Sequence, residues 1–171
     1  MAGTTLRAFA ASYTERMFTT RKATAADASL IADHRYAMFA EMSSSDLASL
    51  EKMRANFVPW VKRALAADKY VAWIVEEEGK TVASAGFFEL DWPPHRLDPA
   101  GERRAYLLNF WVEPVYRRKG LARDLVKEAL AESRRRGIRV TALHASDAGR
   151  KVYEKMGFKT TNEMYFVDGD H

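Results

Sequence analysis

The sequence predicts a single α/β domain, and three observations lead to this prediction. The chain has 171 residues, a length that suits one domain with a core of its own. Segments rich in β-branched and aromatic residues alternate with segments that have the apolar spacing of helices. In the C-terminal half this alternation gives strand, helix, strand, helix and strand, an order that implies a parallel pair joined by a crossover. We expect residues 1–17 to be an N-terminal extension and residues 18–171 to be the domain.

The first elements of this domain are predicted to be a strand and two helices. A strand over Phe18–Lys22 is followed by Thr24 and Asp27, which are spaced as a capping box at a helix start. Residues 43–46 should end that helix and supply the N-cap of the next one. Pro59 lies within the second helical pattern, and we expect it to kink or divide the helix because proline lacks a backbone donor.

A β-hairpin and an apolar strand are predicted next. Residues 70–75 and 82–90 form the hairpin around a tight turn at 78–80. A proline-rich loop over 91–101 leads to a strand over 105–112, which stops near Pro114 because proline cannot donate to a ladder.

The C-terminal third is predicted to hold two helices and two strands. A helix over 121–136 ends at Gly137, a residue type favoured just after a helix. We then expect a strand over 138–143, a helix over 147–156 and a last strand or hairpin arm over 158–167.

Composition excludes several classes of function. The absence of cysteine rules out disulfides, thiolate metal sites and a cysteine nucleophile, and we predict no metal ligands. Lys and Arg exceed Asp and Glu by 27 to 23, and six of the cations form the runs 117–119 and 134–136. Such small clusters favour a phosphate-bearing small molecule over nucleic acid. No apolar run approaches the roughly 18 residues of a membrane span, and the N-terminus does not resemble a secretory signal. We expect a cytoplasmic protein without nucleic-acid or membrane partners.

Residues 109–122 predict an anion site. A buried strand leads into a short loop with three cations and then into a helix start that contains Gly120. The first turn of a helix has free N–H groups and the positive end of the dipole, and glycine lets a ligand approach the backbone. This arrangement is typical of a pyrophosphate site. The alternative is a solvated basic loop before an ordinary helix.

A second segment, residues 143–158, makes the interpretation more specific. It combines a strand end, a turn of small residues, a helix and Gly157-Phe158. The two segments resemble, in order and separation, the two central motifs of the GNAT superfamily of N-acetyltransferases. The matching residues are Val112-Glu113-Pro114, Arg117-Arg118-Lys119-Gly120-Leu121-Ala122, and Ser146 followed by Tyr153-Glu154-Lys155-Met156-Gly157-Phe158. The resemblance is strong over residues 104–160 and weaker before them.

This resemblance implies both a fold and a reaction. The fold would be a mixed, mostly antiparallel central sheet with a parallel, splayed strand pair, flanked by helices. The reaction would be direct attack by a primary amine on the thioester of acetyl-CoA, the acetyl donor. The acceptor would be a small molecule or a peptide, and a homodimer is left open.

The resemblance also assigns residues. It places the pantetheine arm on the main chain of Phe110, Trp111 and Val112. It places the pyrophosphate against Arg117, Arg118, Lys119, Gly120, Leu121, Ala122 and Arg123, and a further cofactor contact at Ser146. Arg117 could instead pair within the protein, and Ser146 could be an N-cap. Tyr153 would be the general acid for the departing thiolate, and the alternative is a packed aromatic side chain.

The general base is not assigned by the motifs. Where relatives carry a glutamate, this chain has Tyr106 and Thr141, which are not usual bases. The remaining candidates are water or Glu41, Glu89, Asp91 and His144. Apolar side chains at helical spacing could line an acceptor pocket, although such residues more often form core: Tyr36, Met38, Phe39, Met42 and Trp60. The alternative function is a GNAT-fold module that binds acyl-CoA without transferring the acyl group.

Overall fold

The computed structural model describes residues 18–42 and 46–164 of the chain. The predicted extension over residues 1–17 lies outside these described residues. The elements in chain order are β1 (Phe18–Lys22), α1 (Ala28–Met42), α2 (Leu47–Ala66), β2 (Tyr70–Glu77), β3 (Lys80–Asp91), β4 (Arg103–Val112), α3 (Leu121–Arg135), β5 (Thr141–Leu143) and α4 (Asp147–Lys155). Two short 3-10 turns, Ala25–Asp27 and Pro114–Tyr116, precede α1 and α3.

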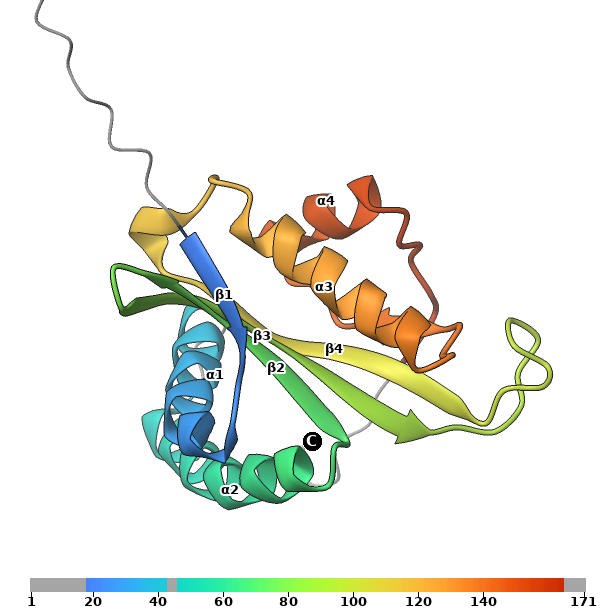
Figure 1. The fold of residues 1–171 in the computed structure, drawn as a ribbon, viewed down its shortest axis with the longest axis horizontal. Helices are drawn as coiled ribbons and strands as arrows, with labels where there is room; N and C mark the ends of the chain where they lie inside the picture. The colour runs from blue at the N-terminus through green and yellow to red at the C-terminus, as the bar shows by residue number, and fades with distance from the viewer. Residues whose placement is uncertain (1–17, 43–45, 165–171) are drawn as a thin grey trace, which may run out of the picture.

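One sheet with the strand order β1-β2-β3-β4-β5 forms the centre of the molecule. The first four strands pair antiparallel, whereas β4 and β5 are parallel. Helices α1 and α2 cover one face of the sheet, and α3 and α4 lie over the other (Figure 1). The predicted fold class is therefore confirmed.

The face under α1 and α2 is held by a compact apolar cluster that includes Ile31, Phe57, Val61 and Ile74. The capping box expected at Thr24 and Asp27 is present and starts the turn that leads into α1. Asp46 accepts hydrogen bonds from the first N–H groups of α2 and is its N-cap, as predicted.

The predicted division of the second helix at Pro59 is wrong, because α2 runs without a break from Leu47 to Ala66. Phe57 and Val61, on either side of the proline, are both buried in the cluster against the sheet. We infer that this packing holds the helix together in spite of the one missing backbone donor.

The opposite face is covered mainly by α3. Its buried residues Leu121, Leu125, Val126 and Ala129 belong to the same cluster as Phe87 and Leu107 of the sheet. This spacing places one apolar stripe on the sheet, which explains why the helical pattern is clear in the sequence. Gly137 follows the helix with a φ of 69°, a left-handed conformation that suits the predicted glycine stop.

Two predicted strands differ from the structure. The strand expected over 138–143 begins only at Thr141, because the Ile138 N–H bonds to the Ser133 carbonyl and closes the end of α3. The strand expected over 158–167 is absent from its described part, residues 158–164, and its last residues lie outside the described chain. The Phe158 N–H instead bonds to the Tyr153 carbonyl, so this residue completes the end of α4. Within the described chain, no helix is long and apolar enough to span a membrane.

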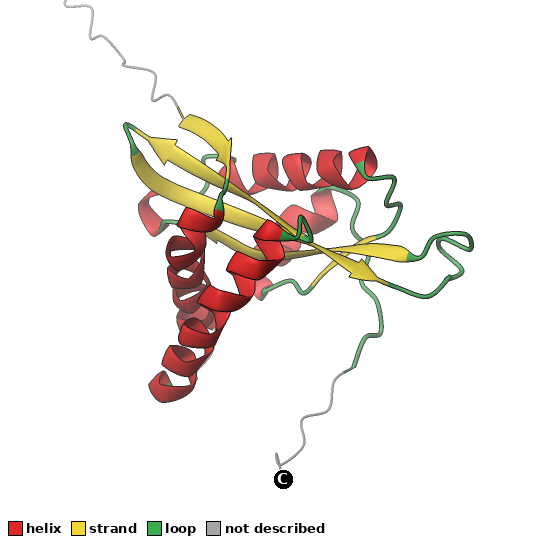
Figure 2. Ribbon diagram, turned by 60° about the horizontal axis from the view of Figure 1, so that its bottom comes forward, coloured by secondary structure: helices red, strands yellow, loops and turns green. Residues whose placement is uncertain are grey.

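The long connection between β3 and β4 projects from one end of the sheet (Figure 2). Its Trp92 ring lies under the guanidinium of Arg104, with 3.9 Å between the carbon of that group and the ring centroid. This cation–π contact fixes the start of the loop on β4.

Candidate active site

The site begins at the point on β4 where its pairing with β5 ends. The parallel pairing joins only Ala105–Leu107 of β4 to Thr141–Leu143 of β5. From Leu108 to Val112, β4 keeps β3 on one side, and the described chain contributes no strand to its other side. This half of β4 therefore has an open edge, where backbone groups can pair with an extended ligand as an added strand would.

A β-bulge lies at the start of this open edge. In the β3–β4 ladder, Gly86 pairs with Leu108 and Ser84 pairs with Trp111. Two residues of β4, Asn109 and Phe110, thus stand opposite the single Ala85. Asn109 has a φ of 57°, in the left-handed region that asparagine tolerates better than most residues. This bulge is not evident in the amino-acid sequence of the strand.

The bulge reverses the direction in which the β4 backbone points. The Ala105 N–H donates to the Val140 carbonyl on the β5 side, whereas the Glu113 N–H donates to Val82 on β3. These residues are an even number of positions apart, so a regular strand would direct both N–H groups to the same side. Beyond the bulge, successive N–H groups again point to alternate sides of β4. Because the Glu113 N–H points to β3, the N–H groups of Phe110 and Val112 point to the open edge.

The three residues predicted to hold the pantetheine arm do not all face the open edge. The main chains of Phe110 and Val112 face the open edge, while that of Trp111 faces β3. The Trp111 indole instead lies against the ring of His34, and its N–H donates to the Glu113 carboxylate at 3.1 Å. Trp111 is thus held from the α1 side of the sheet.

The loop before α3 has the geometry of an anion site. Arg118 and Gly120 have φ angles of 62° and 89°, and α3 begins at Leu121 without a side-chain cap. No acceptor among the described residues receives the backbone N–H groups from 118 to 123. Consecutive free N–H groups in such a turn, at the positive end of a helix, favour a bound phosphate. The predicted pyrophosphate residues Leu121, Ala122 and Arg123 are part of this first turn.

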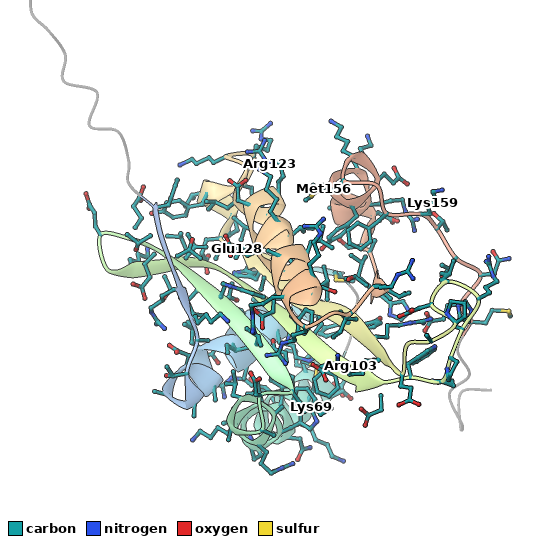
Figure 3. All side chains as sticks on the ribbon, turned by 45° about the vertical axis from the view of Figure 1, so that its right-hand side comes forward. Lys69, Arg103, Arg123, Glu128, Met156 and Lys159 are labelled. Carbon is teal, nitrogen blue, oxygen red and sulfur yellow. The ribbon has the colours of Figure 1, made fainter. Side chains whose placement is uncertain are left out.

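Cationic side chains surround this loop. Arg118, Lys119 and Arg123 are exposed, and Figure 3 shows Arg123 at the N-terminal end of α3. The Lys119 ammonium lies 4.8 Å from the centroid of the Tyr116 ring, and Arg123 pairs with Asp124 at 3.3 Å. These exposed contacts are weak, so both cations are available to an anionic ligand.

Arg117 has a different environment from its neighbours in the basic run. Its Nε donates to the Val112 carbonyl at 3.0 Å, and its Nη2 lies 2.9 Å from both carboxylate oxygens of Glu41. The guanidinium also lies over the Trp111 ring at 5.1 Å. Of the two interpretations of Arg117, the geometry favours pairing within the protein. The same contact ties up Glu41, one of the candidate bases.

Helix α4 places Tyr153 beside the open edge. Its ring packs edge-to-face against Phe110 and Phe158, with centroid separations of 6.2 and 5.7 Å. Burial raises the pKa of the Tyr153 phenol to about 12, so the group is a neutral donor at physiological pH. The structure gives its hydroxyl no hydrogen-bond partner among the described residues. At the start of the helix, Ser146 accepts from the Gly149 N–H at 3.1 Å and is the N-cap, the alternative role considered for it.

Glu89 and Asp91 lie in an ion cluster away from this site. Glu89 is 8% exposed and pairs with Lys69 at 3.5 Å, Arg103 at 3.3 Å and Arg136 at 3.0 Å. Burial favours a higher pKa for Glu89, but hydrogen bonds from Arg136 and Arg103 outweigh it and lower the pKa. Asp91 pairs with Lys69. Figure 3 shows Lys69 and Arg103 at the end of the molecule opposite Arg123, so the cluster is distant from the phosphate loop.

His144 is the candidate base nearest to the point where the strands separate. It follows directly after β5, and its Nδ1 shares a short hydrogen bond with the Tyr106 hydroxyl. Its Nε2 lies 3.8 Å from the carboxylate of Glu163. Tyr106 stands on β4 within the parallel pair, so these two rings connect the strands at the start of the open edge.

The expected acceptor residues of α1 and α2 have mixed environments. Trp60 packs against Phe57, Tyr70 and Phe88 and belongs to the core. The Phe39 ring lies 4.8 Å from the guanidinium carbon of Arg35. Met42 is 50% exposed at the end of α1. Among the described residues, no group of three or more His, Asp or Glu side chains is arranged to hold a metal ion.

Sequence reasoning missed Arg35 and Asn109. The Arg35 Nη1 donates to the Asn109 amide oxygen at 2.7 Å, directly behind the bulge. The available signal was an asparagine within the apolar strand Arg103–Val112, because asparagine is depleted in strands.

Comparison with known proteins agrees with this geometry. The acetyltransferase (GNAT) family matches residues 35–158. A GCN5-related N-acetyltransferase from Ralstonia eutropha JMP134 superposes with a TM-score of 0.84 at 35% identity, covering 88% of this chain and 98% of that one. A predicted acetyltransferase from Clostridium acetobutylicum, solved with acetyl-CoA, gives 0.79 at 28% identity, covering 89% and 96%.

Curated relatives include human N-acetyltransferase 8, which is 31% identical over 55% of this chain and 40% of its own length. The [ribosomal protein bS18]-alanine N-acetyltransferase of Escherichia coli K12 is 28% identical over 70% of this chain and 78% of its own. The chain thus spans less than half of the human relative and most of the bacterial one.

Proposed function

The chain belongs to the acetyltransferase (GNAT) family, and from this membership we propose that it transfers an acetyl group from acetyl-CoA to a primary amine. The observation that carries the proposal is the open edge of β4 beside the free N–H groups of the loop before α3. An extended arm and a pyrophosphate are parts of the same donor molecule, and the protein provides adjacent backbone sites for both.

The residues present fit this donor. The Val112 N–H supports binding of the pantetheine arm as an added strand, and the Phe110 N–H faces the same open edge. The N–H groups of residues 118–123, with the Arg118 and Lys119 side chains, support binding of the pyrophosphate. Glycine suits position 120, because its φ of 89° is a left-handed backbone that a side chain would strain.

Acetyl-CoA supplies a thioester, and the chemistry consists of forming one C–N bond and breaking one C–S bond. The Phe110 N–H at the open edge is our candidate donor to the oxygen that becomes negative during attack. The Tyr153 phenol donates its proton to the sulfur as the C–S bond breaks. The amine nitrogen loses one proton to a base, and return of that proton through solvent to the Tyr153 phenolate closes the proton balance.

We assign this base role to His144, acting directly or through one water, and Tyr106 holds its ring. Glu41 and Glu89 are engaged by arginines, and Asp91 lies with the distant cluster. His144 is the remaining side chain among the four candidates. Its position beside the strand separation supports this assignment.

The acceptor is proposed to be a small-molecule or peptide amine. The name of the Escherichia coli relative specifies the alanine of a ribosomal protein as its acceptor, which supports including N-terminal peptides. The proposed setting is the cytoplasm, where acetyl-CoA is available.

The test is a panel of amines incubated with the protein and acetyl-CoA. The panel holds peptides with N-terminal alanine, lysine peptides, polyamines, aminoglycosides and amino acids. Free-thiol release and mass detection of a product 42 Da heavier report acetylation, a shift fixed by replacing one hydrogen with an acetyl group. Tight acetyl-CoA binding without any product across the panel would favour the alternative, a binding module. Absence of acetyl-CoA binding in titration calorimetry would contradict both.

A further inference from the structure

A buried polar network lies directly behind the β4 bulge. Asn109 is 2% exposed, and each end of its side-chain amide has a partner. The amide oxygen accepts from Arg35 Nη1 at 2.7 Å, and the amide nitrogen donates to the Tyr70 hydroxyl at 2.8 Å. The network therefore joins α1, β2 and β4 at the single residue of β4 that has a left-handed backbone.

The surroundings show that this network is built for that position. Tyr70 is 1% exposed, and its ring crosses β3 at Gly86, where any Cβ would overlap the Tyr70 hydroxyl. Gly86 is also the β3 residue that pairs with Leu108, immediately before the bulge. The absence of a side chain at Gly86 thus lets the Tyr70 hydroxyl reach Asn109.

Arg35 is held without a carboxylate partner among the described residues. Its guanidinium carbon lies 4.8 Å from the Phe39 ring centroid and 4.9 Å from that of Phe57. Burial lowers the pKa of Arg35, and its Nε has no acceptor among the described residues. A cation in this setting gains most from its bond to the Asn109 oxygen, the one side-chain acceptor that the described chain offers it.

A regular strand would alternate faces at every residue, whereas here Leu108 and Asn109 both face α1 and α2. Leu108 packs against the cluster under these helices, and Asn109 bonds to Arg35 and Tyr70. A slip of β4 into a regular strand would move Asn109 off this face and leave Arg35 and Tyr70 unpaired. Loss of the bulge would therefore break both hydrogen bonds of the network and raise the free energy of the protein.

We propose that Arg35, Asn109 and Tyr70 are positioning residues, which lock the β4 bulge and thereby hold the Phe110 and Val112 N–H groups toward the acyl donor. This inference rests on the proposed function, because it assigns those N–H groups to acetyl-CoA. Asn109 and Tyr70 are buried behind the bulge, and Arg35 bonds to Asn109 there, so we assign their effect on catalysis to the position of the backbone.

The test compares two substitutions of the central residue. Asn109→Ala removes both hydrogen bonds and disfavours the left-handed backbone. Asn109→Asp keeps that backbone accessible and offers carboxylate oxygens to both the Arg35 guanidinium and the Tyr70 hydroxyl. We expect acetyl-CoA to bind about tenfold or more weakly to Asn109→Ala, the effect of one lost hydrogen bond, and nearly normally to Asn109→Asp. We expect kcat to fall by on the order of 10²-fold in Asn109→Ala, the effect of a misplacement of about 1 Å.

The matched control is Ser133→Ala. Ser133 is buried, donates to the Ile138 carbonyl at 2.9 Å and lies 3.0 Å from the Thr141 hydroxyl, so its loss also removes two hydrogen bonds but does not touch the bulge. Both alanine variants should lower the melting temperature, and only Asn109→Ala should change acetyl-CoA affinity and kcat. Tyr70→Phe, which conserves volume and breaks only one of the two bonds, is the second variant and should give an intermediate loss.

Backbone NMR shifts of residues 108–112 supply a readout that needs neither binding nor turnover. The Asn109→Ala protein should lose the shifts of a left-handed residue, and Asn109→Asp should retain them. Unchanged shifts in Asn109→Ala, or parental acetyl-CoA affinity in that variant, would overturn the inference. A parent protein that binds acetyl-CoA and acetylates no amine would instead contradict the proposed function, and the shift and binding comparisons would still decide the role of the network.

Discussion

At the scale of single residues, Tyr153 shows how position determines chemistry. Its ring is fixed by Phe110 and Phe158, while its hydroxyl has no partner among the described residues. The side chain is only partly buried, so solvent can satisfy this hydroxyl in the free protein. The phenol beside the open edge is therefore available to a bound donor.

Replacing Tyr153 with phenylalanine should separate catalysis from packing. The ring stays, so the melting temperature and acetyl-CoA affinity should change little. If the phenol is the acid, kcat should fall by roughly 10²-fold, the lower end of general acid catalysis, because a thiolate is a tolerable leaving group. Single-turnover kinetics with a saturating amine would measure the chemical step. A variant with parental single-turnover rate would exclude the acid role and leave Tyr153 as a packing residue.

The raised pKa of Tyr153 also predicts a pH profile. The phenol donates only while protonated, and burial keeps it protonated up to a pKa of about 12. Activity should therefore show no loss from this group in the neutral and mildly alkaline range. Profiles of kcat for the parent and Tyr153→Phe should have the same shape below that value, differing in height. A descending limb near pH 9 that disappears in Tyr153→Phe would contradict the raised pKa.

At the scale of elements, the loop before α3 determines donor binding through its backbone. Gly120→Val should block approach of the pyrophosphate and strain the left-handed position. Gly137→Val is the matched control, because Gly137 also has a positive φ, lies at the other end of α3 and has no atom within 4 Å of an added Cβ. Both variants should lose stability to a similar degree. Calorimetry should show lost acetyl-CoA binding only for Gly120→Val, and equal binding by both variants would contradict the assignment of the loop.

The cations of the same loop should act on the phosphates alone. Arg118→Ala and Lys119→Ala should each weaken CoA binding by about tenfold or more, as expected for charge-assisted hydrogen bonds, and less at high salt. Binding of a pantetheine fragment should be unaffected. Arg134→Ala, an exposed cation near the opposite end of α3, is the control. Equal losses for CoA and the pantetheine fragment would show that these side chains do not bind phosphate.

The elements also show what could be predicted from sequence. Helix α3, the hairpin of β2 and β3, and the glycine loop follow from local patterns: an apolar stripe, alternation around a turn, and Gly120 after three cations. The bulge could not be predicted, because it depends on Arg35, Tyr70 and Gly86, which lie far from Asn109 in the chain. Arg117 shows the same limit, since the motif fixes its place in the loop and only the fold brings Glu41 to it. The assignments of donor contacts and of Tyr153 stay predictions.

At the scale of the whole molecule, an ion cluster joins elements that lie far apart in the chain. Glu132 of α3 is 5% exposed and bonds to Arg136 at 2.7 Å, to Arg135, and to Lys22 of β1 at 3.2 Å. Arg136 continues to Glu89 of β3 and to Asp68 after α2. Burial favours a higher pKa for Glu132, but these bonds outweigh it and lower the pKa from its ordinary 4.5 to about 2.

This lowered pKa predicts an acid-dependent stability. A carboxyl whose pKa is lower in the folded state stabilises the protein above its unfolded pKa and ceases to do so as pH falls through its folded pKa. The free energy of unfolding should therefore decline between about pH 4.5 and 2. Glu132→Gln should lower stability at pH 7 and flatten that decline, as measured by urea unfolding at each pH. Glu128→Gln, an exposed change on the same helix, should do neither. An unchanged slope in Glu132→Gln would contradict the assignment.

The strand order of the sheet has a consequence for folding kinetics. The strands β1 to β5 lie side by side in their chain order, but their pairings span very different lengths of chain. Strands β2, β3 and β4 pair with their neighbours across single connections, whereas β1 pairs with β2 across α1 and α2, as Phe18 does with Glu77. The parallel β4–β5 pair is also non-local, since α3 must first cross over the sheet, and it is the shortest pairing, with only three residues of β5. Local opening should thus cost least free energy at β5 and α4. Native-state hydrogen exchange should find the amides of Thr141–Leu143 less protected than those of β2 and β3. Equal protection of all three strands would contradict this expectation.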